Sequence, residues 1–165
     1  MKISEKPVSR ITYHFLLVLT LLFTCHGLAL ADAPVNTLEK ALFGYKPNGI
    51  AIRGYDTVAY FTESKPVEGD SAYSTEWMGA TWHFASQENL TTFTENPERY
   101  APQYGGYCAY GVAQGYLVKV EPDQWSIVDD KLYLNFDNSV QKKWVKDIPG
   151  YIATADGNIA GLLAK

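Results

Sequence analysis

Side chains that can bind soft metals or act as nucleophiles are scarce in this sequence. After residue 31 the chain holds one cysteine, Cys108, and one histidine, His83. A thiolate and an imidazole together suit copper or zinc. A thiol beside a basic imidazole is also the arrangement of a nucleophilic cysteine. The two residues therefore raise three hypotheses: a metal site, a thiol enzyme, or structural roles for both side chains.

Each hypothesis makes a different demand on the fold. A tight metal site needs three or four ligands, so His83 and Cys108 would need a carboxylate such as Asp56 or groups from a second protomer. Thiol catalysis would use Cys108 as the nucleophile and His83 as the base. In the structural alternative, Cys108 is a small buried residue beside glycines, and His83 is an exposed or hydrogen-bonded strand residue. Contact between the two would favour the first two hypotheses.

A tyrosine-rich and glycine-rich stretch surrounds the cysteine. Residues 104–111 hold three tyrosines and three glycines, a composition typical of backbone that bends sharply between packed rings. Tyr107 joins the ligand-binding candidates because such rings can hold a small planar molecule, although core packing is the favoured interpretation. The sequence has no CxxC, HExxH, P-loop or Gly-x-Ser-x-Gly motif, which argues against several enzyme classes.

The first 31 residues have the pattern of a cleaved secretory signal. Three basic residues precede an uncharged apolar run over 15–23, and Ala29-Leu30-Ala31 follows with small residues at the positions a signal peptidase reads. We expect removal after Ala31 and a periplasmic or extracellular protein. The alternatives are a retained membrane anchor, for which the run is short, and a lipoprotein modified at Cys25.

Cleavage would change the composition of the chain. It removes three basic residues and one acidic residue, so the formal net charge moves from −4 to −6. This charge argues against nucleic acid and anionic membrane surfaces as partners, and we expect no membrane insertion after cleavage. A metal ion, a small ligand or a protein partner remains open. The remaining 134 residues suit one domain with a modest core.

The hydrophobic pattern predicts an α+β fold of short hairpins packed by short helices. Alternation on both sides of Met78-Gly79 predicts a hairpin over 73–84, with Trp82 and Phe84 on the core face and His83 on the opposite face. A second hairpin is expected over 125–136, with a turn at 129–131. The first predicted helix covers 35–43, the second follows its cap Ser86, and a short helical turn follows Pro97. A further helix is predicted from Asn138 or Ser139 to its end at Pro149-Gly150. The final helix is predicted over 152–162. Residues 45–49 are predicted to form a loop.

Several motifs resemble the YHS domain family. Trp82-His83-Phe84-Ala85-Ser86 is similar to its Tyr-His-Phe-x-Ser signature, with Trp82 in place of tyrosine. Similar motifs before and after the signature, in the family's order, span 54–61, 93–100, 104–109 and 132–135. The resemblance covers about residues 50–148, which leaves an extension at 32–49 and a helical tail at 149–165. It implies a YHS/TRASH-like core of the exported, single-domain branch.

The resemblance also implies an association with metals, because related domains occur in metal-transport ATPases and metal sensors. The cysteines of those relatives correspond here to Ala59, Ala85 and Asn89. Metal binding would therefore depend on His83 and Cys108. The function expected from the sequence is an exported binding module, associated with a metal of the copper type. A partner-binding scaffold and a Cys108 enzyme are the alternatives, and the sequence favours an enzyme least.

Overall fold

The computed structural model describes residues 34–165. The predicted signal peptide, with Cys25 inside it, lies outside the described residues. Within the described part of the chain, no helix has both the length and the apolar character needed to cross a bilayer.

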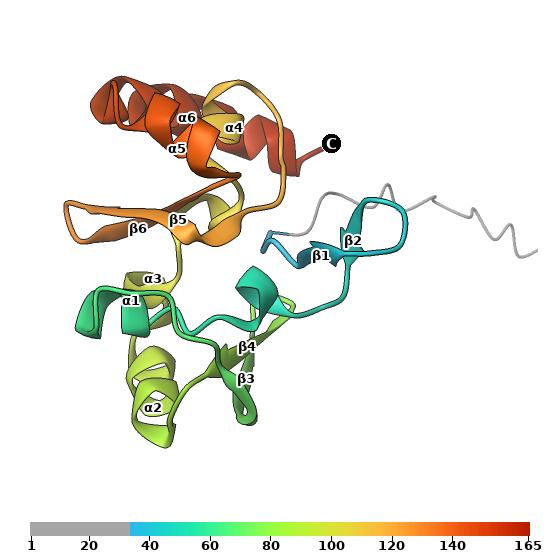
Figure 1. The fold of residues 1–165 in the computed structure, drawn as a ribbon, viewed down its shortest axis with the longest axis vertical. Coiled ribbons are helices and arrows are strands. Elements are labelled where there is room, and N and C mark those ends of the chain that lie inside the picture. Colours follow the sequence, from blue (N-terminus) through green and yellow to red (C-terminus); the bar gives the residue numbers. More distant parts are fainter. Residues whose placement is uncertain (1–33) are drawn as a thin grey trace, which may run out of the picture.

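The described chain forms stacked layers of short helices and two-stranded antiparallel hairpins (Figure 1). The lower part in that view contains β3 (Asp70–Trp77), β4 (Ala80–Phe84), α1 (Ala59–Thr62), α2 (Gln87–Glu95) and α3 (Pro97–Tyr100). The upper part contains β5 (Glu121–Val128), β6 (Lys131–Asn135), α4 (Ala109–Ala113), α5 (Asn138–Trp144) and α6 (Ile148–Leu163). These hairpins and helices confirm the predicted α+β class.

The β3–β4 hairpin has the predicted turn and faces. Met78 and Gly79 form the turn with positive φ angles, which match the twist of the paired strands. Trp82 and Phe84 are buried, whereas His83 is partly exposed between them. Strand alternation therefore separates the imidazole from the core side of the hairpin, as expected.

Helix α2 begins and packs as its sequence indicates. The Ser86 hydroxyl caps it by accepting a hydrogen bond from the Asn89 backbone N–H at 3.1 Å. Phe93 is fully buried, and its ring centroid lies 5.0 Å from that of Trp82 and 4.9 Å from that of Phe84. Helix α2 therefore covers the apolar face of the β3–β4 hairpin.

Strand β6 lies between two hydrophobic clusters. Leu132 and Leu134 pack in a cluster with Trp82, whereas Tyr133 packs in a second cluster with Trp144. Period-two alternation produces this division, because neighbouring side chains point to opposite faces of a strand. The turn before β6 is Asp129-Asp130, and Lys131 already pairs with Val128, so the turn is one residue shorter than predicted.

The helix predicted over 35–43 is wrong. Residues Leu38–Lys40 form strand β1, which pairs with β2 (Tyr45–Pro47), so residues 45–47 are not loop either. Gly44 has a φ of +81°, and its carbonyl accepts a bond from the Ala41 N–H at 2.9 Å, which closes a turn. Leu42 is 90% exposed, so its helical spacing from Leu38 marks no buried stripe.

The expectation that Pro149-Gly150 ends a helix is also wrong. Helix α5 already ends at Trp144, and α6 begins at Ile148 with Pro149 in its first turn. Proline is tolerated there because the first N–H groups of a helix make no intrahelical bond. Asp147 caps α6 by accepting a bond from the Gly150 N–H at 3.1 Å. The final helix therefore starts four residues before its predicted start.

Candidate functional site

Asp56 is completely buried and its carboxylate is saturated with hydrogen bonds. Oδ1 accepts from the backbone N–H groups of Val58 at 2.9 Å and Ala59 at 3.3 Å. Oδ2 accepts from the Ala85 N–H at 2.8 Å and from the Asn89 side-chain amide at 2.7 Å. The carboxylate therefore joins the start of α1 to the end of β4 and to α2.

His83 lies on the side of the β3–β4 hairpin away from Trp82, against two glycines. Its Nδ1 lies 3.4 Å from the position that a Cβ on Gly54 would occupy. A Cβ on Gly69 would lie 2.5 Å from the His83 carbonyl carbon, so that position has no room for a side chain. The Gly69 N–H donates to the Gly54 carbonyl at 2.8 Å. The glycines thus allow two backbone segments to close around a partly exposed imidazole.

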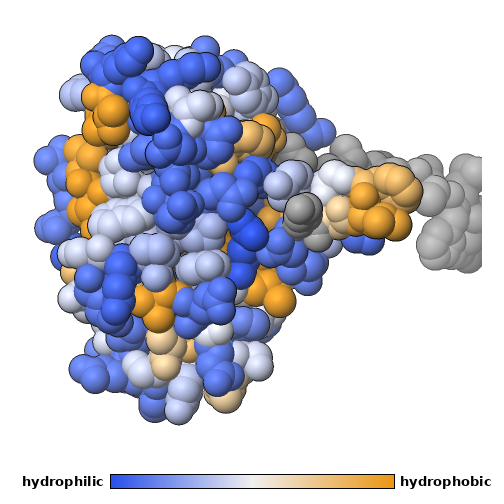
Figure 2. All heavy atoms as spheres, in the orientation of Figure 1, coloured by the Kyte–Doolittle hydropathy of each residue, from blue (hydrophilic) through white to orange (hydrophobic). Residues whose placement is uncertain are grey.

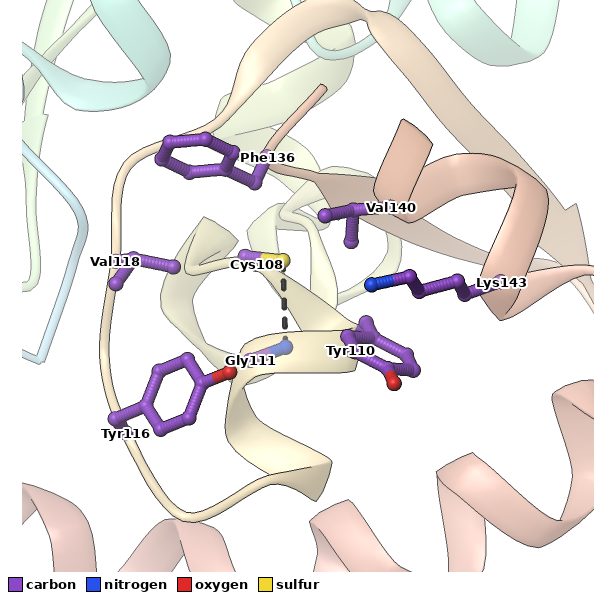
Figure 3. Close-up of a pocket in the computed structure, with 8 residues that line it drawn as sticks. All are labelled: Cys108, Tyr110, Gly111, Tyr116, Val118, Phe136, Val140 and Lys143. Carbon is purple, nitrogen blue, oxygen red and sulfur yellow. Dashed lines mark hydrogen bonds between the residues drawn. The ribbon is translucent and has the colours of Figure 1, made fainter. Parts of the chain in front are cut away.

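Cys108 is 1% exposed and caps the short helix α4. Its Sγ accepts a hydrogen bond from the Gly111 N–H at 3.3 Å, drawn in Figure 3, and donates to Asn135 Oδ1 at 3.6 Å. Burial raises the pKa of the thiol above its usual value, and backbone hydrogen bonds offset only part of that effect. The group is therefore a neutral thiol at pH 7, which makes it a weak nucleophile.

A pocket of about 260 Å³ lies directly over this thiol. Its walls come from α4, the loop before β5, the end of β6 and α5, and they consist of Cys108, Tyr110, Gly111, Tyr116, Val118, Phe136, Val140 and Lys143. Figure 3 shows the Lys143 amine reaching between Tyr110 and Val140 towards Cys108. The pocket therefore combines apolar walls with one thiol and one ammonium group.

The tyrosines of 104–111 divide between the core and the pocket. Tyr104 and Tyr107 are buried in the cluster around Trp144, and the Tyr104 hydroxyl donates to Asp156 at 2.9 Å. Tyr107 does not line the Cys108 pocket, whereas Tyr110 does. Core packing thus accounts for the rings of Tyr104 and Tyr107.

The comparison with protein families matches residues 58–104 to the model of the YHS domain. This stretch is similar to the YHS domain. The match confirms the resemblance seen in the sequence, and it extends from just before α1 to Tyr104. No curated protein and no solved structure matches the chain. Asp56 and Cys108 both lie outside the matched residues.

The Asp56 carboxylate binds residues inside the stretch that matches the YHS domain. Its hydrogen-bond donors include Ala59, Ala85 and Asn89, the three positions that the sequence resemblance implies for the cysteines of metal-associated relatives. A carboxylate bonded to backbone and amide donors therefore occupies the place on which those positions converge. Both its oxygens are already engaged, so a metal would have to displace these bonds.

The predicted site residues do not form one cluster. Within residues 34–165, no group of three or more His, Cys, Asp or Glu side chains is placed to hold a metal ion. His83 contacts the glycines beside β3, whereas Cys108 contacts α4 and Asn135. The donors present do not fit a metal cage built from this chain alone.

The sequence did not single out Lys143, Tyr116 or Phe136 as pocket residues. Lys143 was one of three lysines expected on the surface of the helix after residue 138, and no local pattern distinguishes it from Lys142. Its place in the pocket depends on how α5 packs beside α4. Cys108 was identified because it is the only thiol among the described residues.

Proposed function

We propose that this chain is an exported binding module whose ligand site is the pocket over Cys108. The ligand that fits is a small apolar molecule with an anionic group. The observation that carries this proposal is the pocket itself, in which apolar and aromatic walls surround a buried thiol beside the Lys143 amine. Export rests on the predicted signal peptide.

The size and chemistry of the pocket define the class of ligand. Its volume of about 260 Å³ is at the small end for ligand pockets, which suits a molecule of one ring or a short chain. Tyr110, Tyr116 and Phe136 offer aromatic surface for an apolar body. The Lys143 ammonium offers one charge for a carboxylate. The neutral Cys108 thiol adds a polarizable sulfur to the wall of the pocket.

The same geometry disfavours the thiol enzyme. A catalytic cysteine needs its pKa lowered by a nearby cation, an imidazole or a helix start. Burial instead raises the pKa of Cys108, and His83 makes its contacts elsewhere. The pocket supports binding without requiring a thiolate.

Calorimetric titration with benzoate and with neutral benzamide tests the proposal. We expect benzoate to bind more tightly, and Lys143→Gln to weaken benzoate about fivefold while leaving benzamide unchanged. Lys142→Gln is the matched control, because Lys142 lies on the same helix but does not line the pocket. Bound benzoate should also slow alkylation of Cys108. Failure of both compounds to bind, or equal effects of the two lysine variants, would contradict this function.

A metal-associated module is the second candidate, because the YHS match favours it. Since residues 34–165 alone offer no three-donor cluster, His83 or Cys108 would need further ligands, such as groups from a second protomer. Native mass spectrometry with Cu(I), Cu(II) and Zn(II) tests this candidate beside His83→Ala and Cys108→Ala. Stoichiometric uptake that either variant abolishes would support it, and an unchanged mass with all three metals would remove it.

A further inference from the structure

Among the described residues, the two most exposed large apolar side chains lie on the β1–β2 hairpin. Leu42 is 90% exposed and Phe43 is 91% exposed, whereas Met78 and Val145 are 51% and 55% exposed. The hairpin projects from the side of the stacked layers (Figure 1), and its tip forms an apolar knob (Figure 2). Large apolar patches on a monomer commonly mark an interaction surface.

The fold does not account for these two side chains. Leu42 and Phe43 are the central residues of the turn that the Ala41–Gly44 hydrogen bond closes. Turn positions favour Gly, Pro, Asn, Asp and Ser, each for a backbone reason that leucine and phenylalanine do not share. At their exposures, both side chains also contribute little to core packing. An apolar medium outside the chain would explain them.

The base of the hairpin is fixed to the body of the protein, so the tip is held out rather than loosely attached. Asn36 is buried; its backbone N–H donates to the Gly105 carbonyl at 2.8 Å, and its side-chain amide donates to the Gly106 carbonyl at 2.9 Å. Arg53 reaches β1 through an ion pair with Glu39 at 3.3 Å.

The charges near the tip indicate which apolar environment would receive Leu42 and Phe43. Residues 40–48 contain two lysines and no acidic residue, although the whole chain carries a net charge of −4. Apolar tip residues with the exposed Lys46 on the adjoining strand β2 suit the interface of an anionic bilayer, where apolar side chains enter the headgroup region and the ammonium group meets lipid phosphates. At physiological salt, charges act over about 10 Å, so Lys46 on β2 contributes to binding when the tip meets the bilayer.

We propose that the β1–β2 hairpin docks the protein on an anionic lipid surface by inserting Leu42 and Phe43. This surface is independent of the Cys108 pocket. It refines the expectation from net charge, which treats the chain as uniformly acidic. The hairpin inserts only its tip, so the interaction is peripheral.

Co-sedimentation with vesicles tests this inference on exported protein whose intact mass shows that residues 1–31 are absent. The probes are phosphatidylglycerol–phosphatidylcholine vesicles and pure phosphatidylcholine vesicles. We expect binding to the anionic vesicles, weakened at least about thirtyfold by Leu42→Ser with Phe43→Ser. Lys46→Glu should weaken it about tenfold. Met78→Ser is the matched control, because it removes an exposed apolar residue from the tip of another hairpin, and it should change nothing.

Two results would overturn the proposal. One is the absence of vesicle binding, or equal binding by the Leu42/Phe43 variant and the original protein. The other is a dimer of the original protein, measured by light scattering, that becomes a monomer in the Leu42/Phe43 variant while neither protein binds vesicles. The tip would then contact a second copy of the chain and not a bilayer. Melting temperatures of the variants show that each is folded.

Discussion

The YHS part of the molecule and the part that follows it use their polar residues in different ways. In the first part, backbone N–H groups bind the Ser86 hydroxyl and the carboxylate of Asp56, which lies two residues before the YHS match. In the second part, the Lys143 amine faces a cavity whose base is the Cys108 thiol. The difference teaches that the YHS signature in this chain maintains the frame, whereas the chemistry available to a ligand lies beyond the matched residues.

Removing the Asp56 carboxylate is the strongest test of the frame. Asp56→Ala should lower the free energy of unfolding by about 3 kcal/mol, because it leaves the buried N–H groups of Val58 and Ala59 without an acceptor. Urea denaturation measures the change. Asp123→Ala is the control, since Asp123 is exposed, and it should change stability by less than about 0.5 kcal/mol. A loss of similar size in both variants would contradict a special role of the Asp56 carboxylate in stabilising the fold.

A smaller loss is expected at the junction between the two parts. Gly105 has a φ of +63°, and a Cβ there would lie 1.9 Å from the Pro34 carbonyl oxygen. Gly105→Ala should therefore destabilise the protein by about 2 kcal/mol through crowding and a strained backbone. Thermal unfolding measures it. An unchanged melting temperature would show that the 34–36 segment moves aside without cost.

An ion-pair network across the junction predicts a pH dependence of about 1 kcal/mol. Burial alone would raise the pKa of Glu121, but bonds from Lys119 and Arg53 outweigh it and hold that pKa below its usual value. Because the folded pKa is lowered, this stabilisation is present above the unfolded pKa, near 4.5, and is lost as pH falls through the folded pKa.

Glu121→Gln tests that network. The variant should be about 1 kcal/mol less stable at pH 7, a small value because the Glu121 side chain is 33% exposed. In urea titrations repeated across pH, the difference from the original protein should shrink as pH falls below 4.5 and vanish once pH is below the lowered folded pKa. A difference that stays constant from pH 7 to pH 3 would show that charge plays no part.

The smallest expected effect has the opposite sign. Gly157 lies inside α6 with open space around it, so Gly157→Ala should stabilise the protein by about 0.5–1 kcal/mol through helix propensity. The melting temperature is the measurement. Destabilisation at this site would mean that α6 needs the glycine for a contact outside the described chain.

The sequence predicted those features that local patterns determine. The β3–β4 hairpin, the Ser86 cap and the side of the hairpin on which His83 lies follow from alternation and capping within a few residues. The helical spacing within 35–43 predicts a helix wrongly, because it takes no account of the turn that Gly44 closes. Pro149 was read as a stop, although a proline in the first turn of a helix is equally favourable.

Less of the candidate site than of the fold could be predicted from the sequence. Cys108 was found by its rarity, but the pocket over it needs side chains from four separate segments. Lys142 and Lys143 are both exposed, and the packing of α5 beside α4 decides which of them lines the pocket. The convergence of Ala59, Ala85 and Asn89 on Asp56 likewise appears only when the chain is folded.

Strand β6 connects the two hydrophobic clusters of the molecule. Because Leu134 packs in one cluster and Tyr133 in the other, neither cluster can open without exposing the strand to solvent. The backbone amides of β6 should therefore exchange their hydrogens only in whole-molecule opening. A ligand that touches Phe136, the next residue after β6, would slow that exchange and extend its effect into the YHS half.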